Sequence, residues 1–134
     1  MNADVYRETL LDHYRHPRNY GDLPGANARA RESNVLCGDV LEMQLRLNGG
    51  KIEDVKFRGE GCAISLASAS MLTEFSKGKS ISEIKGLGKK DIIGLLGADP
   101  GPMRIECALL GLKAMKMAIY AHSGIKMPKE LEET

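Results

Sequence analysis

The sequence is poor in aromatic residues and in net charge. It has no tryptophan, four tyrosines, two phenylalanines and a formal net charge of +1 over 134 residues. Few rings are therefore available to stack on bases, and no long-range field attracts nucleic acid. No apolar run approaches the roughly 20 residues of a membrane-spanning helix, and residues 1–14 carry charge where a signal peptide has its apolar centre. We therefore expect a cytoplasmic protein that binds neither nucleic acid nor a membrane.

Cysteines are few, and the sequence has no CxxC pair. The three cysteines, Cys37, Cys62 and Cys107, are far apart in the chain and match no zinc-finger spacing. An odd number in a reducing compartment argues against a disulfide framework. Metal binding, chemical reactivity and three separate buried cysteines all remain open on spacing alone.

The rest of the composition is that of a folded domain. Apolar residues make up 43% and charged residues 28% of the chain, which argues against wholesale disorder. The length suits one domain spanning residues 1–134, with residues from about 125 onward expected as a flexible tail.

Two segments alternate apolar and polar residues with the period of a half-buried strand. They are VLEMQLRL at residues 40–47 and KIEDVKFRG at residues 51–59, joined by Asn48-Gly49-Gly50. Such turn residues tolerate positive φ, so a β-hairpin is predicted. Alternating alanines at residues 26–30 indicate a third, short edge strand.

Helical periodicity accounts for most of the remaining chain. Ser80 and Glu83 have the capping-box spacing that opens a short helix. The other predicted helices cover residues 5–14, from just after 61 to about 78, 91–96 and 104–121. The fold class is therefore α+β, a small antiparallel three-stranded sheet covered by helices.

The three cysteines fall at element boundaries instead of inside apolar runs. Cys62 is placed where the hairpin's second strand meets a helix, Cys107 in the first turn of the last helix, and Cys37 in the loop before the hairpin. Helix N-termini favour thiolate, the form that binds metal or attacks sulfur. Asp39 is either a fourth ligand or a turn aspartate that accepts backbone N–H groups. As a ligand, its hard oxygen would hold iron or zinc less strongly than a fourth thiolate, which favours a site that releases its cargo.

Four motifs resemble those of the U-type iron–sulfur cluster assembly scaffolds, the family of IscU, SufU and the NifU N-terminal domain. They are LLDHYRHPRNYG, CGDV, GEGCAISLASASMLTEFSKGK and RIECALLGLKA, at residues 10–21, 37–40, 59–79 and 104–114. The resemblance covers nearly the whole chain and implies a SufE/NifU-like fold. It also implies that Cys37, Asp39, Cys62 and Cys107 form one site for a transient [2Fe–2S] cluster or for Zn²⁺. Its expected partners are a PLP-dependent cysteine desulfurase and iron–sulfur acceptor proteins, with a homodimer as one arrangement of the cluster-bound form.

Two positions depart from the IscU pattern. Glu106 stands where IscU proteins carry histidine, and it is an alternative ligand, an anion at a helix N-terminus or a solvated side chain. PGPMR at residues 100–104 replaces the LPPVK that a dedicated chaperone reads in IscU proteins. The second cysteine motif looks like SufU, while the chain lacks the extra segment of SufU proteins before the third cysteine.

The leading hypothesis is a scaffold, not an enzyme, that accepts sulfur from the desulfurase, builds a cluster and passes it on. Cys107 is expected to accept the sulfur, because the Pro/Gly break before it should let it move and because this is the role of the third cysteine in IscU proteins. The main alternative is a zinc-bound, SufU-like sulfur acceptor. A structural zinc module and a cysteine hydrolase are further alternatives, the latter requiring His13, His16 or His122 as a base.

Overall fold

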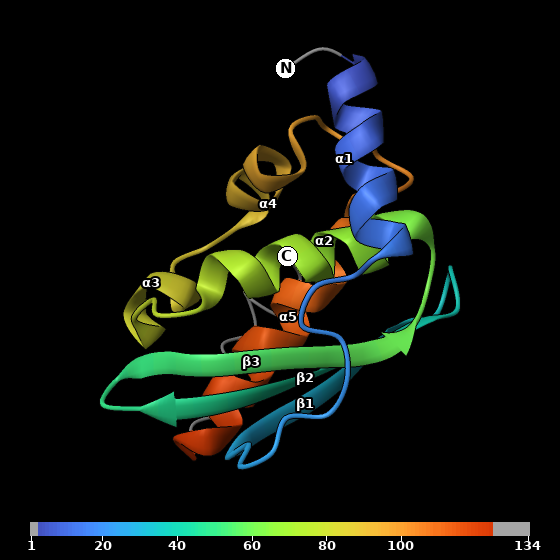
Figure 1. Cartoon of the computed structure of the whole chain (residues 1–134). Helices are drawn as coiled ribbons and strands as arrows, with labels where there is room; N and C mark the ends of the chain where they lie inside the picture. The colour runs from blue at the N-terminus through green and yellow to red at the C-terminus, as the bar shows by residue number, and fades with distance from the viewer. Residues whose placement is uncertain (1–2, 125–134) are drawn as a thin grey trace.

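The computed structural model describes residues 3–124, with side chains from Val5 onward. Its elements follow the chain in this order: α1 (Ala3–Arg15), β1 (Ala28–Asn34), β2 (Asp39–Asn48), β3 (Lys51–Glu60), α2 (Ala63–Ser76), α3 (Ile81–Lys85), α4 (Lys89–Leu96) and α5 (Ile105–His122). The strands form one antiparallel sheet in the order β1-β2-β3. The α+β class and the three-stranded sheet are confirmed (Figure 1).

The β2–β3 hairpin follows the predicted alternation. Gly49 and Gly50 have φ of 61° and 76°, the left-handed pair that a two-residue hairpin turn requires. Four alternating β2 residues are buried on the helix-covered face: Leu41, Met43, Leu45 and Leu47. β1 reaches Asn34, further than the predicted edge strand, and so runs directly into the turn that carries Cys37.

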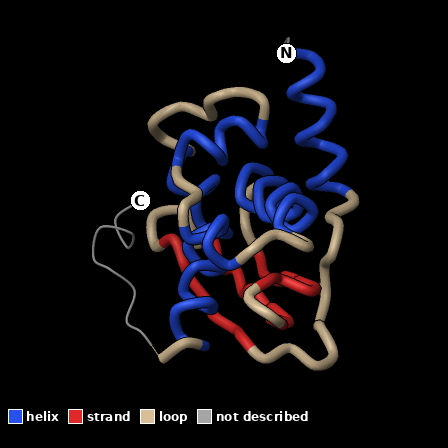
Figure 2. The backbone as a smooth tube through the Cα atoms, turned by 90° about the vertical axis from the view of Figure 1, so that its left-hand side faces the viewer, coloured by secondary structure: helices blue, strands red, loops and turns tan. Residues whose placement is uncertain are grey.

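Two helices cover one face of the sheet. α5 contacts β1 and β2, and α2 contacts β3 (Figures 1 and 2). The segment after α1 lies along the outer edge of β3, where the N–H of Phe57 donates to the carbonyl of Asn19 and that of Gly21 donates to the carbonyl of Phe57. This backbone pairing protects an edge that would otherwise expose unpaired groups.

Helix α2 is buried on more than one face. Its small residues are buried on several sides, among them Ser65, Ala67, Ala69 and Ser70, because α1 covers the side that α5 and the sheet leave free. A Cβ placed on Gly111 of α5 would lie 3.2 Å from the Cβ of Ala69. The alanines and serines after Cys62 thus allow close packing of helices.

The helix ends agree with the predicted signals to within two residues. The hydroxyl of Ser80 accepts the N–H of Glu83 at 3.1 Å, as a capping box requires. The Glu83 carboxylate lies 3.4 Å from that hydroxyl and does not reach back to the Ser80 N–H. Residues 125–134, expected as a flexible tail, lie outside the described part. Within residues 3–124, no helix is long and apolar enough to cross a membrane.

Candidate metal centre

Cys37 lies on a tight turn between β1 and β2. The carbonyl of Asn34, the last residue of β1, accepts the N–H of Cys37 at 3.2 Å and that of Gly38 at 2.8 Å. Gly38 has a φ of 73°, a left-handed conformation that glycine adopts without a steric cost. The turn leaves the Cys37 thiol exposed at the end of the sheet.

Asp39 begins β2, and its two carboxylate oxygens have different surroundings. Oδ1 accepts the backbone N–H of Cys62 at 3.1 Å. Asp39 is only 2% exposed, and its Oδ2 is buried without a hydrogen-bond partner among the described residues. A buried oxygen without a partner is costly unless something binds it. One oxygen thus serves the backbone, as in the turn-aspartate interpretation, and the other is free for a ligand.

Folding brings Cys107 to the same place from the other end of the chain. Its Sγ lies 3.1 Å from the Sγ of Cys37. The candidate ligand atoms of Cys37, Asp39 and Cys107 all lie within 4.8 Å of one another. These three predicted site residues therefore form one group, at the right-hand end of the sheet in Figure 1.

Cys62 lies next to this group but is not a full member of it. It is the N-cap residue of α2 and is half-buried. Its thiol is among the groups that raise the pKa of Cys107, and its backbone N–H donates to Asp39 Oδ1. Its Sγ nevertheless falls outside the set of atoms that lie within 4.8 Å of one another. The structure thus gathers three of the four predicted ligands tightly and places the fourth beside them.

Burial opposes the thiolate form of Cys107 that a helix N-terminus favours. Cys107 lies in the first turn of α5 but is fully buried. Burial, followed by the neighbouring thiols of Cys37 and Cys62, raises the pKa of Cys107. The loss of hydration outweighs the helix dipole here. A bound cation would reverse this balance, because a coordinating thiol is deprotonated.

Glu106 does not join the group. Its side chain is exposed and helps to line a shallow groove of about 300 Å³ with Val35, Leu36 and Lys113. Among the described residues, no histidine hydrogen-bonds to a cysteine: His13 meets Ser70, and His122 meets the carbonyl of Asn27. Within residues 3–124, no histidine is thus hydrogen-bonded to a thiol as the base of a cysteine hydrolase would be.

Ser65 and Asp39 lie so close to the backbone of Gly61 that a larger residue does not fit there. A Cβ there would lie 2.3 Å from the Ser65 Oγ and 3.2 Å from the Asp39 Cγ. Glycine at this position gives the Asp39 carboxylate room to lie against the chain that leads into α2.

Three exposed large apolar side chains lie near Cys37 and Cys107 in the chain. Val35 and Leu36, on the Cys37 turn, are 92% and 94% exposed, and Met103, just before α5, is 85% exposed. Large apolar side chains gathered on a surface mark sites of protein contact. Their position beside Cys37 and Cys107 makes this end of the molecule suited to a protein partner.

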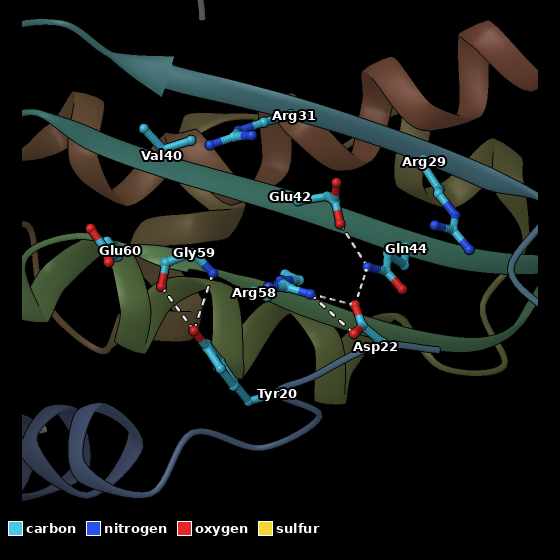
Figure 3. Close-up of a pocket in the computed structure, with 10 residues that line it drawn as sticks. All are labelled: Tyr20, Asp22, Arg29, Arg31, Val40, Glu42, Gln44, Arg58, Gly59 and Glu60. Atoms are coloured by element: carbon cyan, nitrogen blue, oxygen red, sulfur yellow. Dashed lines mark hydrogen bonds and ion pairs between the residues drawn. The ribbon is translucent and has the colours of Figure 1, made fainter. Parts of the chain in front are cut away.

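A cavity of about 610 Å³ lies elsewhere, on the face of the sheet that the helices leave open (Figure 3). Figure 3 shows Arg58 pointing to Asp22, which also accepts from the buried amide of Gln44. No cysteine lines this cavity. It is a polar surface hollow, separate from the candidate metal centre.

The donor set of the cysteine group suits zinc or iron. Both metals take thiolate ligands, and both accept a carboxylate oxygen in place of a fourth sulfur. The Asp39 carboxylate has one oxygen within 4.8 Å of both sulfur atoms, and its buried Oδ2 has no partner among the described residues; a bound cation would satisfy such a carboxylate. The fold and this group together define a small α+β protein with a thiol–carboxylate group that could hold a metal ion at one end of its sheet.

The chain belongs to the NifU-like N terminal domain family, whose sequence profile matches residues 5–129. It is similar to the zinc-dependent sulfurtransferase SufU of Bacillus subtilis (strain 168), with 36% identity over 90% of this chain and 92% of that protein. It is also similar to the iron–sulfur cluster assembly scaffold protein IscU of Aquifex aeolicus (strain VF5), with 42% identity over 85% of this chain and 73% of that protein.

A solved structure shares the fold. It is the N-terminal part of a nitrogen-fixing NifU-like protein from Brucella abortus, with a TM-score of 0.74, 19% identity, and coverage of 90% of this chain and 96% of that one. The family resemblance and the fold expected from the motifs are confirmed.

Proposed function

We propose that this protein is a scaffold for iron–sulfur cluster assembly that takes sulfur from a cysteine desulfurase and passes the finished cluster to acceptor proteins. The cargo is held by Cys37, Asp39, Cys62 and Cys107. The observation that carries the proposal is the group of Cys37, Asp39 and Cys107, in which a carboxylate oxygen of Asp39 lies within 4.8 Å of two thiols that contact each other. Oδ2 of the same buried carboxylate has no hydrogen-bond partner among the described residues. The names of the IscU and SufU relatives support the same function.

Sulfur transfer needs a thiol that a protein-bound persulfide can reach. In the proposed step, a thiolate of this chain attacks the outer sulfur of the desulfurase persulfide, and the sulfur–sulfur bond breaks. The desulfurase cysteine leaves as a thiolate, and no external oxidant or reductant is needed. We assign the attack to Cys107. Because its thiol is buried, the exposed segment before α5 must move first, and Gly101 in that segment has a φ of 90°.

The acceptor assignment is tested by following the sulfur. Wild type, Cys107→Ser and Cys37→Ser are each incubated with the desulfurase and cysteine, and the persulfide on each chain is measured by mass spectrometry. Cys107→Ser should lose the added sulfur and Cys37→Ser should keep it. A Cys107→Ser protein that accepts sulfur at the full rate, while Cys37→Ser does not, would overturn the assignment.

The partners follow from the chemistry and from the surface. The apolar rim formed by Val35, Leu36 and Met103 supports docking of a protein that delivers sulfur directly to the thiols. The proposal places this exchange in the cytoplasm, where free thiols stay reduced. A cluster shared between two copies of the chain is one form of the loaded state.

A second candidate function is that of a zinc-bound sulfur acceptor that stimulates a desulfurase. The observation that favours it is the similarity to SufU over 92% of that protein's length. When bound, zinc would hold the thiols deprotonated and stabilise the fold. Cys37, Asp39, Cys62 and Cys107 would be its ligands.

Anaerobic reconstitution with iron, cysteine and a desulfurase separates the two functions. A scaffold should gain a transient visible absorbance from iron–thiolate charge transfer, and Asp39→Ala should make that chromophore longer-lived because the weak oxygen ligand is gone. A zinc sulfur acceptor should stay colourless, retain zinc and accelerate the desulfurase. Glu106→Gln is the matched control, since it removes an exposed carboxylate outside the ligand group, and it should behave as wild type.

A further inference from the structure

Asn34 is placed where the two closest thiols of the site meet. It is the last residue of β1 and pairs with Asp39 across the β1–β2 ladder. Its carbonyl closes the Cys37 turn, as described above. Its side chain is free to face the site, since the turn is held by the backbone.

The orientation of the Asn34 side-chain amide is fixed by its contacts. The backbone N–H of Leu36 lies 3.2 Å from Oδ1 and can only donate, so the oxygen must face Leu36. The amide nitrogen Nδ2 therefore points the other way. It donates to the Sγ of Cys37 at 3.6 Å and to the Sγ of Cys107 at 3.8 Å.

We propose that Asn34 is a positioning residue of the metal centre, and this inference rests on the proposed function. Its two amide hydrogens hold the Cys37 and Cys107 sulfurs side by side, 3.1 Å apart, before any cargo arrives. Once the sulfurs are ligands, the same N–H groups withdraw electron density from them. Hydrogen bonds from such outer groups orient metal ligands and tune the metal.

Two variants separate what the Asn34 amide donates to sulfur from what its oxygen accepts from the Leu36 N–H in the turn. Asn34→Asp keeps an oxygen that accepts the Leu36 N–H but replaces the donor amide with an oxygen that cannot donate to sulfur. Asn34→Ala removes both contacts without adding a charge. Asn48→Asp is the matched control, because it makes the same chemical change at an exposed turn residue whose amide contacts Glu53.

The experiment measures binding of Co²⁺ alone to the metal-free, reduced full-length proteins, followed by Zn²⁺ competition. Asn34→Asp and Asn34→Ala should bind Zn²⁺ about 10- to 100-fold more weakly than wild type, the usual effect of losing an outer-shell partner. The sulfur-to-cobalt charge-transfer band should move to longer wavelength, because the sulfurs become more electron-rich. Asn48→Asp should match wild type in both measurements.

Two negative results have different meanings. If wild type shows no sulfur-to-cobalt band, the metal centre itself is overturned, and the role of Asn34 with it. If wild type shows the band and Asn34→Asp reproduces its wavelength and affinity, only the role of Asn34 is overturned. If Asn34→Ala binds metal more weakly while Asn34→Asp binds as wild type does, the bond from the Leu36 N–H matters and the bonds to sulfur do not. That result also overturns the proposal.

Discussion

Replacing Gly61 with alanine tests the close approach that shapes the metal centre. The added Cβ would lie 2.3 Å from the Ser65 Oγ, a distance that real contacts do not reach, and 3.2 Å from the Cγ and Oδ1 of Asp39. Something must therefore move. Ser65 is fully buried and its hydroxyl donates to the carbonyl of Cys62 at 3.0 Å, so rotation of its side chain breaks that bond.

The cost can be estimated from these contacts. Losing the Ser65 hydrogen bond costs about 1 kcal/mol. The Cys62 carbonyl stays satisfied, because it also accepts the N–H of Leu66 at 3.1 Å. Overpacking against Asp39 adds strain within the usual range of about 1–3 kcal/mol for an inserted methyl group. Gly61→Ala should therefore lower the free energy of unfolding of the metal-free protein by about 2–4 kcal/mol.

Urea denaturation of a double-mutant cycle provides the assay. Ser65→Ala removes the atom that clashes, so Gly61→Ala should cost less in that background, with a coupling of about 1 kcal/mol or more. Gly94→Ala is the control, since its Cβ meets nothing within 4 Å on an exposed position of α4, and it should stabilise the protein by up to about 1 kcal/mol. If Gly61→Ala and Ser65→Ala add within about 0.5 kcal/mol, the close-approach argument is refuted.

Two further predictions concern the scaffold beneath the site. Gly59 in β3 has a φ of 149°, and a Cβ there would lie 2.0 Å from the carbonyl oxygen of Val40. Gly59→Ala should therefore lower the free energy of unfolding by about 3 kcal/mol or more. A urea midpoint within experimental error of wild type would contradict this. Burial, followed by the charge of Arg18, lowers the pKa of His13 below its ordinary value of 6.5, against a smaller opposing effect of Glu74. The unfolded chain then binds more protons than the folded protein as pH falls through the ordinary value, so stability is full above about pH 7 and declines toward pH 5. His13→Gln should flatten this decline in unfolding free energy measured across that range, and an unchanged slope would exclude His13 as its source.

The sequence determined much of the secondary structure, because the relevant signals are local. Strand alternation placed every second residue from Leu41 to Leu47 on the core face, and the two glycines after Asn48 supplied the left-handed turn. The hydroxyl of Ser80 caps α3 by accepting the N–H of Glu83, three residues on. Each of these depends on residues a few positions apart. The depth of α2 was missed, since the second helix that buries it, α1, is distant in the chain.

The candidate ligands were also chosen from sequence, but their arrangement was not. Residue type and position at element boundaries, together with the family motifs, pointed to Cys37, Asp39, Cys62 and Cys107. Only the tertiary structure decided that Cys62 lies at the side of a tighter group, that Asp39 keeps one buried oxygen free, and that Asn34 donates to two sulfurs. Burial of Cys107 likewise raises its pKa, against the effect expected from its helix position. These features arise where β1, β2, α2 and α5 meet, and desolvation and contacts across such distances leave no periodic signal along the chain.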